Sequence, residues 1–168
     1  MLWNERTVYR EEPFETEADF EEAILKVAPA LFGDARLYLD VERLIGARGR
    51  TRDIPDGYLI DLASIRDPKL FVVENELGKH EPLRHVAVQI LEFSLSFESS
   101  PHSVKGIVRD ALAQRPDFLL RGQEYARRNG FENVDLLLER MIHGSNRFNA
   151  FVVIDELDEE HHRNWTPS

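Results

Sequence analysis

An apolar run, Leu70-Phe71-Val72-Val73, leads without a break into the polar triplet Glu74-Asn75-Glu76. Four consecutive apolar residues of this kind are typical of a buried strand. Because side chains two apart in an extended chain face the same side, we expect Glu74 and Glu76 to point together. Carboxylates at the end of a buried strand repel one another and lose solvation, so they need a compensating cation. The chain is therefore expected to build a sheet with clustered acids at one end.

Another acid lies at the start of the preceding strand pattern. Asp56 follows Pro55 and opens a candidate strand over residues 58–62, and Arg66-Asp67-Pro68 marks a turn between this strand and the next. If the two strands pair as a hairpin, Asp56 lies beside Glu74. Oxygen ligands of this kind suit Mg²⁺ or Mn²⁺. Two plainer interpretations stay open: Pro-Asp-Gly is also a common turn sequence, and the glutamates could be solvated acids at an exposed strand end.

Helical patterns surround these strands. Thr16 is a candidate N-cap of a helix that ends near Gly33, and Pro29 either kinks that helix or ends it early. Pro82 suits the first turn of a helix running to about Phe97. Further patterns predict strands at 37–44 and 150–154 and helices within 101–116, 118–128 and 133–142. This order predicts an α/β fold, with one mixed sheet flanked by helices.

The length of 168 residues fits one ordinary domain. We divide it into an N-terminal arm or short strand (1–15), a core that carries the motifs (16–97), a helical segment (98–147), and a final strand with an acidic tail (148–168). The same ending is compatible with one domain of a longer protein. The absence of cysteine excludes a disulfide framework, a thiolate zinc site and a cysteine nucleophile. We see no signal peptide or membrane-spanning stretch and expect a cytoplasmic protein.

The net charge of −10 argues against broad, non-specific binding to nucleic acid. Its distribution is uneven, because residues 43–52 carry Arg43, Arg48, Arg50 and Arg52 and no acid. This run has two interpretations. It is either solvated surface or a set of phosphate contacts, since arginine is the preferred phosphate-binding residue.

The order of these motifs resembles the PD-(D/E)xK nuclease superfamily, whose restriction-endonuclease-like core is a helix, a three-stranded antiparallel meander, a helix and a strand. Pro55-Asp56 matches the PD element, and Glu74-Asn75-Glu76 falls where (D/E)-x-K belongs. Gln89 matches a glutamine on the following helix. Glu21 matches the acid of the first helix, with Glu17 as the competing choice. Helix-face acids and a surface pair of His85 with Gln89 are the plainer interpretations of these helical residues.

The sequence departs from the family at position 76, where glutamate replaces the usual lysine. Some restriction endonucleases are similar in using glutamate here, and Lys79 is a candidate for reaching back into the site. The resemblance implies metal-dependent phosphodiester hydrolysis, most simply by a DNA endonuclease or exonuclease, with RNA in place of DNA as the alternative substrate. It implies Mg²⁺ or Mn²⁺ held by Asp56, Glu74 and the backbone carbonyl of Asn75.

The other roles follow from the same resemblance. Glu76 would be a second ligand or the base that orients the water, Glu21 would hold an outer water or a second metal ion, and Gln89 would orient the water or the phosphate. Arg48, Arg50 and Arg52 would contact the nucleic-acid backbone. Cleavage of a duplex needs two active sites or two binding events, so a homodimer is compatible with this function.

Two alternatives stay open. One is a nuclease-fold module that has lost catalysis and acts in binding nucleic acid or protein, favoured by Glu76 and the negative charge. The other is an unrelated α/β interaction domain in which Asp56, Glu74 and Glu76 are dispersed surface acids.

Overall fold

The computed structural model describes residues 2–4, 7–9, 13–41, 54–78, 82–144 and 148–156. Its main sheet has four strands in the order β3-β4-β5-β6. Strands β3 (Arg36–Asp40), β4 (Gly57–Asp61) and β5 (Lys69–Glu76) form an antiparallel meander, and β6 (Ala150–Ile154) joins β5 in parallel. The expected α/β fold with one mixed sheet flanked by helices is confirmed.

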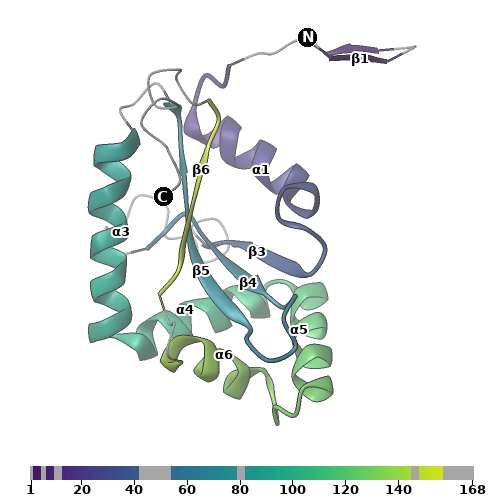
Figure 1. Ribbon diagram of the computed structural model, residues 1–168, viewed down its shortest axis with the longest axis vertical. Coiled ribbons are helices and arrows are strands. Elements are labelled where there is room, and N and C mark those ends of the chain that lie inside the picture. Colours follow the sequence, from purple (N-terminus) through teal and green to yellow (C-terminus); the bar gives the residue numbers. More distant parts are fainter. Residues whose placement is uncertain are drawn as a thin grey trace, which may run out of the picture.

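Helices cover both faces of this sheet (Figure 1). The helices are α1 (Glu17–Phe32), α3 (Pro82–Ser99), α4 (Pro101–Ala113), α5 (Pro116–Arg128) and α6 (Val134–His143). Helix α1 lies on one face, where Phe20 and Ile24 pack with Leu59 and Val73 of the sheet. On the other face, residues of α3, α4, α5 and α6 share a core with the remaining inward side chains of β3, β4 and β5.

The ends of α1 follow the sequence signals. Thr16 Oγ1 accepts a hydrogen bond from the Asp19 backbone N–H at 3.2 Å, and Gly33 ends the helix with φ at 87°. The expectation that Pro29 could end the helix early is wrong, because α1 continues to Phe32. Pro29 lies in the last turn, and its carbonyl still accepts a hydrogen bond from the Gly33 N–H at 2.9 Å.

Other strand boundaries differ from those expected from the sequence by a few residues. The strand expected at 37–44 ends at Asp40 in the structure, and residues 42–53 lie outside the described part. The N-terminal arm contains two short antiparallel strands, β1 (Leu2–Asn4) and β2 (Thr7–Tyr9). No helix of the described residues is long and apolar enough to cross a membrane.

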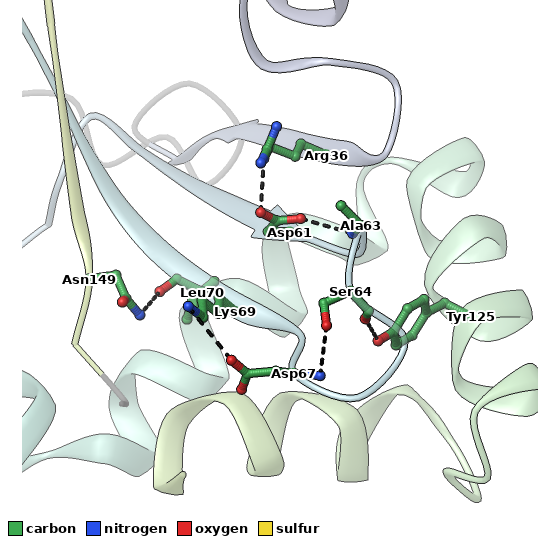
Figure 2. A network of polar contacts seen from close by, with 9 residues as sticks. All are labelled: Arg36, Asp61, Ala63, Ser64, Asp67, Lys69, Leu70, Tyr125 and Asn149. Carbon is green, nitrogen blue, oxygen red and sulfur yellow. Dashed lines mark hydrogen bonds and ion pairs between the residues drawn. The ribbon is translucent and has the colours of Figure 1, made fainter. Parts of the chain in front are cut away.

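One end of the sheet is closed by a polar network around the loop that joins β4 to β5 (Figure 2). Arg36 Nε donates to Asp61 Oδ2 at 2.9 Å, and Asp61 Oδ1 accepts from the Ala63 N–H at 2.8 Å. The Tyr125 hydroxyl of α5 donates to the Ser64 carbonyl. Arg36, Asp61 and Tyr125 are thus paired at this end, whereas the acids singled out in the sequence, Asp56, Glu74 and Glu76, lie at the other end of β4 and β5.

Candidate active site

The register of the meander places Asp56 beside Glu74. Gly57 pairs with Val73, so one further step along the antiparallel ladder brings Asp56 level with Glu74. Asp56 Oδ2 accepts a hydrogen bond from the Asn75 backbone N–H at 2.7 Å, and the Asp56 carbonyl accepts one from the Val41 N–H at 3.0 Å. The pairing expected from the sequence therefore occurs, and both the backbone and the carboxylate of Asp56 are held.

Glu74 and Glu76 lie on the face of β5 that packs against α3. Val72, two residues before Glu74, belongs to the core on that face together with Phe93 and Phe97 of α3. The two glutamates are 3% and 5% exposed. This burial counts against the interpretation of Glu74 and Glu76 as solvated surface acids, because buried carboxylates need partners to offset their lost hydration.

Gln89 lies on the face of α3 that packs against the rest of the molecule. Val86 and Phe93 are buried, and Gln89 falls between them at helical spacing. Its Oε1 atom is buried and has no hydrogen-bond partner among the described residues. Buried amide oxygens normally accept a hydrogen bond, so Gln89 Oε1 could accept one from a water or a ligand between α3 and the sheet.

The opposite face of the same sheet end carries Tyr38 and Asn75. Asn75 Nδ2 donates to Tyr38 Oη at 3.0 Å, and the Tyr38 ring stacks on Phe32 at a centroid distance of 5.3 Å. Burial and the nearby carboxylates of Asp40, Asp56 and Glu21 raise the pKa of Tyr38, against the opposing effect of the Asn75 hydrogen bond. Tyr38 therefore keeps its proton at neutral pH.

On the α3 face, burial and the carboxylate of Glu74 raise the pKa of Tyr58. A buried tyrosine thus lies within electrostatic range of the acids on each face. The sequence reasoning missed Tyr38, Tyr58 and Asp40. Asp40 carried a usable signal, since it ends the run Leu37-Tyr38-Leu39 in the same way as Glu74 ends its own apolar run.

Of the remaining site residues expected from the sequence, some lie in the described part of the structure and others lie outside it. Glu21 is partly buried and close enough to Tyr38 to affect its pKa, whereas Glu17 is exposed in the first turn of α1. Glu21 is therefore the better placed of the two choices. The expected contributions of Lys79, Arg48, Arg50 and Arg52 fall outside the described residues.

The carboxylate and carbonyl oxygens at this sheet end are of the kind that binds hard divalent cations. Among the residues that the structure describes, no three histidine, aspartate or glutamate side chains are arranged to hold a metal ion together. Mg²⁺, however, usually binds through one or two carboxylates and keeps several waters. Asp56, Glu74 and the Asn75 carbonyl are the groups at this end that could form such a set, and Gln89 Oε1, which has no hydrogen-bond partner among the described residues, could accept from a bound water.

Comparison of the chain with models of protein families, with curated proteins and with solved structures gave no match.

Proposed function

We propose that this chain is a metal-dependent nuclease of the PD-(D/E)xK type, acting on DNA. The observation that carries the proposal is the pairing of Asp56 with the Glu74-Asn75 segment, in which a carboxylate accepts from a backbone N–H beside a buried glutamate. The element order supports it, because a helix, an antiparallel meander, helices and a further strand follow one another as in a restriction-endonuclease-like core.

Each residue has a defined task in this proposal. Asp56, Glu74 and the Asn75 carbonyl would hold Mg²⁺ or Mn²⁺, and the bound ion would polarise a phosphate oxygen and lower the pKa of a coordinated water. Glu76 takes the place of the lysine and orients or deprotonates the attacking water. Gln89 accepts a hydrogen bond from that water through Oε1, and Glu21 holds an outer water on the α1 side.

A binding module without catalysis is the second candidate function. Glu76 stands where the usual lysine would supply a positive charge, and the chain has a net charge of −10. In this alternative, the acids still hold a cation, but the site does not break the phosphodiester bond.

The test is cleavage of supercoiled DNA, linear DNA and single-stranded RNA with Mg²⁺, Mn²⁺ or EDTA. We expect cutting that requires the metal and that falls by more than about 100-fold in Asp56→Asn, since removing a residue that merely orients a ligand already costs about 10- to 100-fold. Asp67→Asn is the matched control, because Asp67 lies in the exposed loop at the other end of the sheet.

Three outcomes separate the candidates. Metal-dependent cutting lost only in Asp56→Asn supports the nuclease. Metal binding without cutting, together with cutting by Glu76→Lys, supports the module that has lost catalysis. Cutting that is equal in wild type and Asp56→Asn, or that persists in EDTA, contradicts the proposed site.

A further inference from the structure

The middle residue of the Glu74-Asn75-Glu76 segment faces away from its two neighbours. Asn75 lies on the α1 face of β5 between Val73 and Leu77, the residue that follows the strand, and both of these apolar neighbours are fully buried. Asn75 is 6% exposed, and its Oδ1 atom has no hydrogen-bond partner among the described residues. A buried amide with an unmatched acceptor lowers stability relative to an apolar residue, so packing alone does not explain an asparagine here.

The side chain of Asn75 forms a hydrogen bond with Tyr38. Its Nδ2 atom donates to Tyr38 Oη at 3.0 Å, while its backbone N–H donates to Asp56 Oδ2 at 2.7 Å. A single residue therefore ties the hydroxyl on the α1 face to the carboxylate at the end of β4. Its backbone also carries the carbonyl that the proposed function assigns to the metal.

Tyr38 is itself held firmly. Its ring packs over Gly57, where a Cβ atom would come within 2.6 Å of Tyr38 Cε2, and stacks on Phe32. A ring that packs closely against two neighbours has little room to move, so its hydroxyl is a stable hydrogen-bond partner.

We propose that Tyr38 and Asn75 form a positioning pair that sets the backbone of Asn75, and through its N–H the Asp56 carboxylate, in the geometry that binds the metal. This inference rests on the proposed function. The side chains of the pair are given no contact with the substrate or the metal, because the Asn75 side chain points to the face opposite Glu74 and Glu76. The role of the pair is to keep the Asp56 carboxylate, just before β4, and the Asn75 carbonyl of β5 at a constant separation.

The experiment measures Mn²⁺ affinity by titration calorimetry without nucleic acid, in wild type and in Tyr38→Phe. This substitution removes the hydroxyl and keeps the ring on Gly57 and Phe32. We expect Mn²⁺ to bind about 10-fold more weakly, as found for residues that orient metal ligands. We also expect saturating Mn²⁺ to restore cleavage, which a general loss of folding would not allow.

Two further variants make the test specific. Asn75→Ala should weaken Mn²⁺ binding. The double variant that also carries Tyr38→Phe should lose no more Mn²⁺ affinity than Asn75→Ala alone, because both substitutions remove the same hydrogen bond. Tyr125→Phe is the matched control: Tyr125 is a buried tyrosine whose hydroxyl donates to Ser64 at the far end of the sheet (Figure 2). Its removal should leave Mn²⁺ affinity unchanged.

The failures are distinguishable. Tight Mn²⁺ binding that Asp56→Asn abolishes and Tyr38→Phe leaves unchanged overturns the positioning pair and keeps the proposed site. Additive losses in the double variant also overturn the pair. No Mn²⁺ binding by wild type, or binding that Asp56→Asn does not weaken, contradicts the proposed function and removes the ligand that the pair would position.

Discussion

Gly57 lies directly after Asp56, and its missing side chain lets Tyr38 approach the backbone of β4. A Cβ at position 57 would also lie 2.9 Å from the Leu39 carbonyl oxygen. Contacts of that length require the backbone of β3 or the Tyr38 ring to move. Glycine is therefore required at this position by close packing, in addition to any turn that Pro-Asp-Gly forms.

We predict that Gly57→Ala destabilises the protein by about 1–3 kcal/mol, the usual cost of overpacking a core. Urea denaturation measures the change. Gly106→Ala in α4 is the matched control, because a Cβ there meets no atom within 4 Å, and alanine is favoured over glycine inside a helix by about 1 kcal/mol. Equal stability of Gly57→Ala and wild type would show that the ring does not rest on Gly57.

For single residues, the sequence was sufficient to find Asp56, Glu74 and Glu76, but not Asp40 or the two buried tyrosines. The period of two residues predicts that Glu74 and Glu76 share a face, and burial on the α3 side agrees with it. Tyr38 could not be found in this way, because its role depends on which strand lies beside β4. Strand pairing over such a distance in sequence leaves no local pattern.

Among the elements, α4 and α6 are joined by one lysine. Lys105 Nζ lies 2.6 Å from Asp135 Oδ2 and 2.7 Å from Glu139 Oε2. Hydrogen bonds to both carboxylates raise the pKa of Lys105, and the same lysine lowers the pKa of Glu139 below its ordinary value of 4.5. The ion pair of Lys105 with Glu139 therefore stabilises the folded state at pH values between the pKa of Glu139 and the pKa of Lys105, and this range includes neutral pH.

We predict that Lys105→Met lowers the melting temperature by no more than about 4 °C at neutral pH. A carboxylate whose pKa is lowered in the folded state contributes its full stabilisation at pH values above its pKa in the unfolded state. This stabilisation disappears as the pH falls through its pKa in the folded state. The difference between variant and wild type should therefore shrink between about pH 7 and about pH 3. Lys26→Met is the control, since Lys26 pairs with Glu22 within α1 and both side chains are exposed. A difference independent of pH would contradict the ion-pair account.

The positions of the helices and strands were largely predictable, because caps and apolar periods are local signals. Thr16 and Gly33 bound α1 as expected, and β5 continues through Glu76. The alternative of an earlier end at Pro29 does not occur, since a proline in the last turn removes only one backbone donor and the helix still ends at Gly33. The parallel pairing of β6 with β5 also has no local signal.

For the whole molecule, the negative charge opposes the approach of nucleic acid. A chain with net charge −10 must concentrate its phosphate contacts in a small basic region. The run of residues 43–52 is the candidate for that region on sequence grounds, although it lies outside the described residues.

We predict that changing Arg48, Arg50 and Arg52 together to glutamine weakens DNA binding and reduces its dependence on salt. Log affinity falls with log salt concentration, and each lost phosphate contact makes this fall less steep by about 0.9, so the loss of three contacts reduces the magnitude of the slope by about 2.7. Arg66→Gln, in the exposed loop between β4 and β5, should leave the slope unchanged. Fluorescence anisotropy across a salt series measures both. An unchanged slope in the triple variant would mean that these arginines contact no phosphate.

The central claim is that Asp56 and Glu74, brought together by the β4–β5 pairing, form a metal site that hydrolyses phosphodiester bonds. The most direct measurement is the single-turnover rate of DNA cleavage with Mn²⁺ for wild type and Glu74→Gln, purified in the same way and matched by thermal melting. The account predicts a metal-dependent rate in wild type and a loss of more than about 100-fold in the variant. Equal rates in two equally folded proteins, or no cleavage by wild type, would contradict it.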